Sequence, residues 1–174
     1  MPENLSGPRN IIRLHAGRAR VEPDDWHLLQ TAEWDGQPGA VLPLALALAQ
    51  TARVRAAGRV GLWLGPADDP ADAVPLFDAL SLIGVQFPKF TDGRGYSTAY
   101  LLRTRLGWRG ELRALGDVLQ DQLFALRRVG FDSFALRADR DPSAALAGFD
   151  AFTGSYQGSV DQPLPAFRRG TDQP

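Results

Sequence analysis

The stretch that decides the fold is GRVGLWLGPADDPADAVPLFDALSLIGVQF, residues 58–87. It has a short apolar run at residues 60–64, a Gly-Pro turn, a helix expected at residues 70–80, and a second apolar run at residues 82–87. Apolar runs that lack polar alternation are typical of strands that are buried on both faces. Because a helix separates the two runs, they predict a crossover between parallel strands.

The same alternation continues on both sides of this stretch. Downstream, a helix with Ser97 as its cap is expected, followed by a strand at residues 111–115. The next expected helix has Asp117 as its cap and ends at Gly130, and a strand follows at residues 131–136. Upstream, an Ala/Leu-rich helix is expected at residues 42–57, after a hairpin or edge strand at residues 11–21. The pattern predicts an α/β fold: a mainly parallel sheet of about four or five strands with βαβ crossovers, half-barrel-like or open.

Length and composition favour one globular domain. The chain has 174 residues, of which 44% are hydrophobic and 22% charged, enough to bury one sizeable core. A last helix is expected to open at Asp141 and to reach about residue 157. We therefore predict a single α/β domain at residues 1–157 with an irregular N-terminal segment. Residues 158–174 are rich in proline and glycine and are expected to form an extended or disordered tail.

Charge and cysteine content exclude several classes of function. The net charge is −1, from 19 basic and 20 acidic residues, so no partner nucleic acid is expected. The most apolar stretch, residues 40–49, is shorter than the ~20 residues of a membrane span and is expected to be a buried helix. No targeting pattern opens the chain, which predicts a cytoplasmic protein. Without cysteine, thiolate chemistry and cluster ligation are excluded, and no metal site is expected.

The candidate site is the loop that follows the strand at residues 82–87. Parallel strands place ligand sites at their carboxyl ends, and a helix N-terminus favours anions. The loop combines cations, a carboxylate and glycines that let a ligand approach the backbone; its candidate ligand-binding residues are Lys89, Asp92, Gly93, Arg94, Gly95 and Ser97. A small anion or a phosphorylated ligand fits this set. The alternative is a rigid turn in which Ser97 only caps the helix.

A second set of charged residues lies on and after the strand at residues 111–115. Glu111, Arg113 and Asp117 are candidates for supporting contacts behind the anion loop, because charges on a buried strand need a partner or a ligand. Alternatively, Glu111 and Arg113 pair with each other or with Asp92, and Asp117 is only a helix cap. Farther along, Phe124 is expected to be an exposed aromatic among charged residues, a candidate partner contact.

Three stretches resemble one bacterial family: residues 87–97, residues 110–124 (GELRALGDVLQDQLF) and residues 130–134 (GFDSF). The sequence is similar to the proteobacterial family of unknown function labelled "oxidoreductase probably involved in sulfite reduction", encoded beside assimilatory sulfite reductase. The resemblance implies an accessory protein of sulfur metabolism whose partner is sulfite reductase or its electron donor. The chain lacks the cysteines that the reductase's own cluster needs.

Cofactor use stays open at this point. No phosphate-binding P-loop occurs, and Gly93-x-Gly95 lies too far from the preceding strand for a dinucleotide fingerprint. We therefore expect no tightly bound cofactor. The alternative function is a small oxidoreductase with a dissociable nicotinamide or flavin at the anion loop.

Overall fold

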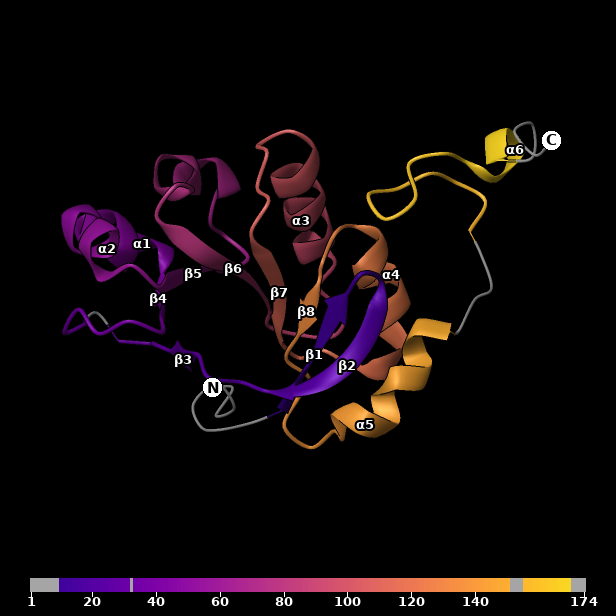
Figure 1. The fold of residues 1–174 in the computed structure, drawn as a ribbon, viewed down its shortest axis with the longest axis horizontal. Helices are drawn as coiled ribbons and strands as arrows, with labels where there is room; N and C mark the ends of the chain where they lie inside the picture. Colours follow the sequence, from indigo (N-terminus) through magenta and orange to yellow (C-terminus); the bar gives the residue numbers. More distant parts are fainter. Residues whose placement is uncertain (1–9, 32, 151–154, 170–174) are drawn as a thin grey trace.

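The computed structural model describes residues 10–31, 33–150 and 155–169. Its centre is one eight-stranded sheet with the order β2-β1-β8-β7-β6-β5-β4-β3. The sheet curls but does not close, which makes the fold an α/β half-barrel (Figure 1).

Two kinds of strand pairing make the sheet mixed. The strands β3 to β8 run parallel, whereas the hairpin of β1 and β2 is antiparallel and joins the sheet through antiparallel pairing of β1 with β8. The expectation of four or five mainly parallel strands is therefore wrong in two respects: the sheet has eight strands, and it is mixed because the hairpin joins it by antiparallel pairing. The strand bounds are β1 Asn10–His15, β2 Arg18–Pro23, β3 His27–Leu28, β4 Ala40–Pro43, β5 Val60–Leu64, β6 Leu80–Phe87, β7 Glu111–Gly116 and β8 Ser133–Phe134.

Short helices connect the parallel strands from β4 to β8. They are α1 Leu44–Ala49, α2 Thr51–Ala57, η1 Pro70–Leu76, α3 Arg94–Thr104, η2 Gln120–Gln122 and α4 Leu123–Arg128. After β8 follow α5 Pro142–Ala145, η3 Leu146–Asp150 and α6 Ala166–Arg169. Within the described parts of the chain, none of these helices is long and apolar enough to cross a membrane.

The expected strands at residues 60–64, 82–87 and 111–115 are confirmed as β5, β6 and β7, and the N-terminal hairpin is confirmed as β1 and β2. The expected helix at residues 40–49 is wrong in its first part, because Ala40–Pro43 pairs with β5 as strand β4. Here the parallel pairing of residues 40–43 with β5 stabilises the strand by more than the helix propensity of alanine and leucine favours a helix. The helix that follows is interrupted at Gln50, between α1 and α2.

The main core lies between one face of the sheet and the helices. Strand residues such as Leu62, Ile83 and Leu112 have no exposed surface there and pack with Val54 and Leu102 from the helices. On the opposite face of the sheet, no helix among the described residues contributes to the hydrophobic clusters. Instead, the segment that links β2 to β4 crosses it: Trp26 packs with Val41 and Leu82, and the Trp63 indole donates a hydrogen bond to the Leu29 carbonyl, 2.9 Å away.

Candidate functional site

The loops at the carboxyl ends of the parallel strands are tied to one another. After β5 and β6, the Arg94 guanidinium donates a hydrogen bond to the Pro66 carbonyl (3.3 Å). After β6 and β7, the backbone N–H of Phe90 donates to the Asp117 carboxylate (2.8 Å). The other oxygen of Asp117 accepts from Arg137, which follows β8, at 3.0 Å. These bonds connect four successive loops into one edge, which we call the carboxyl edge.

Asp92 and Arg94 form an ion pair with each other. The Asp92 carboxylate accepts hydrogen bonds from Nε and Nη2 of Arg94, at 2.9 and 2.6 Å, and from the Arg94 backbone N–H at 3.1 Å. These bonds lower the pKa of Asp92 from 3.8 to about 2. The pair therefore stabilises the start of α3, and the charge of Arg94 is already largely balanced.

Lys89 differs from the other cations of this edge. Its side chain is exposed, and among the described residues its ammonium group has no carboxylate partner. In contrast, Arg137 pairs with Asp117 at 3.0 Å and with Asp139 at 2.6 Å. Lys89 thus gives the carboxyl edge a positive charge that no carboxylate of the described residues neutralises in an ion pair.

The remaining loop residues serve the start of α3. Gly95 is buried, and a Cβ atom at this position would lie 2.5 Å from the Phe87 ring, so glycine allows the helix to approach β6. Gly93 is the N-cap residue of α3, in open space. The prediction that Ser97 caps this helix is wrong, because α3 already begins at Arg94. Instead of a serine, the Asp92 carboxylate accepts a hydrogen bond from the Arg94 backbone N–H at the start of the helix.

Asp117 is at the carboxyl edge, as expected, but it is no helix cap. Leu119 precedes η2 instead, and the Gln122 side chain accepts a hydrogen bond from the Leu119 backbone N–H at 2.9 Å. Both oxygens of Asp117 hold neighbouring loops. Its role is therefore to join the Lys89 loop to Arg137.

The structure does not bring Glu111 and Arg113 to the anion loop. They lie on the sheet face that the segment between β2 and β4 crosses, where Arg113 is only 2% exposed. Its guanidinium donates to both oxygens of Asp24 (2.8 and 2.9 Å), to Glu111 (2.7 Å) and to the Ser133 hydroxyl (3.0 Å). Arg13 extends the cluster, since it donates to Glu111 at 3.2 Å and to Glu22 at 2.9 Å.

The sequence reading found the pair of Glu111 and Arg113 but missed Asp24, Ser133 and Arg13. Asp24 lies 89 residues from Arg113 along the chain and Arg13 lies 98 residues from Glu111. These residues come together only when the strands have formed the sheet. The available signal was the charge of Arg113 between the apolar residues Leu112 and Ala114 of a buried strand, which requires a buried counter-charge.

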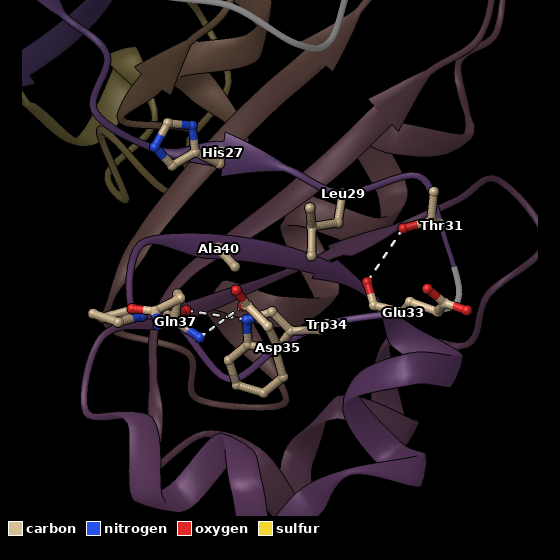
Figure 2. Close-up of a pocket in the computed structure, with 9 residues that line it drawn as sticks. His27, Leu29, Thr31, Glu33, Trp34, Asp35, Gln37 and Ala40 are labelled. Atoms are coloured by element: carbon tan, nitrogen blue, oxygen red, sulfur yellow. Dashed lines mark hydrogen bonds between the residues drawn. The ribbon is translucent and has the colours of Figure 1, made fainter.

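A separate cavity of about 590 Å³ lies beside the edge strand β3 and the beginning of β4. Figure 2 shows its lining, in which Trp34 donates its indole hydrogen bond to the Gln37 carbonyl at 3.0 Å and Asp35 accepts from the Gln37 backbone N–H at 3.0 Å. We call it the edge pocket. Its lining residues are His27, Leu29, Thr31, Glu33, Trp34, Asp35, Gln37, Pro38 and Ala40.

Two other expectations concern metals and partners. In the part of the chain that the structure describes, no three acidic or histidine side chains are grouped so that they could hold a metal ion. Phe124 is half-buried rather than exposed, and the Arg127 guanidinium lies 5.3 Å from the centre of its ring. The part of Phe124 available to a partner is therefore smaller than expected.

The fold and this edge define an α/β half-barrel with an exposed, partly basic carboxyl edge. A family model described as "Bacterial protein of unknown function (DUF934)" matches residues 61–167, and the chain belongs to this family. Neither a curated protein nor a solved structure gives a significant match.

Proposed function

We propose that this protein is a cytoplasmic accessory protein of assimilatory sulfite reduction that binds a small oxyanion or a phosphorylated ligand at the carboxyl edge. The observation that carries the binding part is the ammonium group of Lys89, which has no carboxylate partner among the described residues and lies in a loop at the carboxyl end of β6. The sulfur assignment is supported by the resemblance in residues 87–97, 110–124 and 130–134. In this function, the protein's partner is sulfite reductase or its electron donor.

The choice of lysine supports a ligand at this position. Of the 19 basic residues only Lys89 is a lysine, and the others are arginines. An ammonium group is a compact charge with three rotatable donors, whereas a guanidinium is a broad planar fork. The compact ammonium group can approach a small oxyanion closely. The neighbouring loops, fixed through Asp92 and Asp117, hold the backbone around Lys89 in place.

Ligand binding is tested by thermal unfolding of the purified protein with sulfite, sulfate, phosphate, NADPH or a flavin. A ligand at one hundred times its Kd stabilises the native state by about 2.7 kcal/mol, which raises the Tm of a chain of this size by roughly 5–10 °C. We expect one of the oxyanions or phosphorylated compounds to raise the Tm. Stabilisation by NADPH or a flavin with cofactor turnover favours the alternative function, an oxidoreductase with a dissociable cofactor.

Substitutions locate the site. We expect Lys89→Ala and Lys89→Arg both to abolish the ligand-induced rise in Tm, while the unliganded Tm stays within about 2 °C because the side chain is exposed. Arg18→Ala, an exposed cation on β2, is the matched control and should keep the full response. An undiminished response in Lys89→Ala contradicts the proposed site.

Growth experiments test the sulfur assignment separately. A strain without this gene should grow slowly on sulfate or sulfite and normally on cysteine, and the Lys89→Ala gene should not restore growth. Equal growth on all three sulfur sources contradicts the assignment, whatever the binding results are.

A further inference from the structure

A second cavity, of about 420 Å³, lies between the end of α3 and the C-terminal segment at residues 155–169. We call this segment, yellow in Figure 1, the arm, and we call the cavity the arm pocket. Helix α3 and the loop after it line the pocket with Tyr100, Arg103 and Arg109. The arm lines it with Val160, Pro163 and Pro165.

Hydrogen bonds to the end of α4 fix the arm beside the domain. The Arg128 carbonyl accepts from the Val160 backbone N–H at 3.0 Å and from the Ser159 hydroxyl at 2.6 Å. The Arg128 guanidinium donates to the Gln157 carbonyl, also at 2.6 Å. The side of the pocket that the arm forms is therefore attached to the rest of the fold.

The arm pocket is basic. Its lining contains two arginines and no aspartate or glutamate, whereas the edge pocket is lined by Glu33 and Asp35 and by no lysine or arginine. Burial lowers the pKa of Arg103, and the positive charge of Arg109 lowers it further, although Asp132 opposes this shift. The two guanidinium groups thus lie close enough to repel each other, and an anion beside them would relieve the repulsion.

The two arginines differ in the contacts that they already make. The Arg103 guanidinium pairs with the Asp132 carboxylate at 2.8 Å. It also donates to three backbone carbonyls at 2.9 to 3.1 Å, those of Trp108, Gly110 and Gly130. The Arg109 side chain is exposed, and its guanidinium forms no ion pair or hydrogen bond with another described residue. Arg109 is therefore available to a ligand.

Tyr100 adds an aromatic surface to this charge. The residue is 46% exposed, and its hydroxyl forms no hydrogen bond with another residue that the structure describes. Because residues three apart on a helix lie on the same face, its ring is on the side of α3 that carries Arg103. Pro163 and Pro165 give the arm side of the pocket an apolar surface. The pocket thus combines a guanidinium with a ring and apolar walls.

We propose that the arm pocket binds a small aromatic anion, with its carboxylate or phosphate group on Arg109 and its ring against Tyr100. A guanidinium binds either oxyanion through two parallel hydrogen bonds. A cavity of about 420 Å³ lies within the usual size range of small-molecule sites. Helix α3 begins at the carboxyl edge, whereas the arm pocket lies beside its last five residues. This site is therefore separate from the one proposed at Lys89.

Calorimetric titration with phenyl phosphate and with benzoate tests the proposal. The Lys89→Ala protein is used, so that the carboxyl edge does not contribute and the outcome is independent of the function proposed above. We expect at least one of the two probes to bind with a Kd below about 1 mM, and the tighter one identifies the oxyanion. Inorganic phosphate, which lacks the ring, and phenol, which lacks the charge, should each bind at least tenfold more weakly.

Substitutions place the probe in the arm pocket. Arg109→Ala should weaken binding tenfold or more, as expected for the loss of hydrogen bonds between charged groups. Arg105→Ala is the matched control, because this exposed arginine does not line the pocket, and it should bind like the parent protein. Tyr100→Ala should also weaken binding, and Tyr100→Phe should retain it. Circular dichroism melting confirms that each variant folds.

Hydrogen exchange gives a second readout. A ligand between α3 and the arm should slow the exchange of peptides from residues 155–169 in the parent protein but not in Arg109→Ala, and peptides that cover β2 should not change. The proposal is overturned if neither probe binds, if Arg109→Ala binds as tightly as the parent protein, or if a saturating probe leaves exchange in the arm unchanged.

Discussion

At the scale of single residues, Arg113 has the most unusual environment among the described residues. Its guanidinium is almost completely buried, yet Asp24, Glu111 and Ser133 satisfy it from three different directions. Asp24 belongs to the segment that crosses the face of the sheet opposite the main core, and Arg113 belongs to a central strand. The ion pair therefore fastens this covering segment to the sheet.

We predict that Asp24→Ala lowers the free energy of unfolding by about 3 kcal/mol, because it leaves a buried guanidinium without one of its counter-charges. Urea denaturation followed by tryptophan fluorescence measures the change. The matched control is Asp25→Ala, since the Asp25 side chain is 69% exposed and pairs with Arg59 on the surface. An exposed pair of this kind contributes at most about 1 kcal/mol. Equal losses for the two variants contradict the fastening role of Asp24.

At the scale of elements, α3 shows how a helix is seated on the sheet by a missing side chain. Gly95 lies in the first turn of α3, directly against the Phe87 ring at the end of β6. Glycine is an unfavourable helix residue, but here it allows the helix backbone to approach an aromatic ring. Packing thus takes precedence over helix propensity.

Gly95→Ala is expected to destabilise the protein by about 1–2 kcal/mol, although alanine is the better helix former. The added methyl group would lie 2.5 Å from the Phe87 ring, and overpacking costs typically 1–3 kcal/mol. Gly93→Ala is the control, since no atom lies within 4 Å of its Cβ position; its effect should stay within about 0.5 kcal/mol. Thermal and urea denaturation measure both. A stabilised Gly95→Ala variant would show that the helix does not need this close approach.

The elements that could be predicted from the sequence are those with a local cause. The runs at residues 60–64, 82–87 and 111–115 are apolar in themselves, and the structure contains them as β5, β6 and β7. The strands β3 and β4 have only two and four residues, and their neighbours define them more than their own pattern. The loop around Lys89 could be predicted from the sequence because its residues are consecutive in the chain. The partners of Arg113 could not be predicted, because Asp24 and Ser133 lie far from it in the sequence.

At the scale of the whole molecule, the half-barrel has a protected centre and two open edges. β6 lies between β5 and β7, with helices over one face, while β2 and β3 form the two ends of the sheet. Hydrogen bonds in such a sheet open locally with free energies that rise toward the core. The order of the strands therefore predicts an order of stability.

Hydrogen exchange measured by mass spectrometry should show this order. We expect the amides of Ile83, Val85, Leu112 and Ala114 to exchange most slowly, near the rate set by global unfolding. Peptides that cover β3 should exchange faster by several orders of magnitude, because this strand has two residues and one neighbour. Equal protection of β3 and β6 would contradict the predicted gradient.

The pairing of β1 with β8 also has a consequence for biosynthesis. Ile12 lies beside Phe134, about 120 residues later in the chain. At ordinary translation rates of about 5–20 residues per second, the ribosome needs roughly 6 to 24 seconds to make this stretch. During that time the hairpin of β1 and β2 has left the exit tunnel without its place in the sheet, and Ile11 and Ile12 remain open to water and to chaperones. The nascent chain completes its sheet only after β8 has emerged, so its first strand is among the last to be secured.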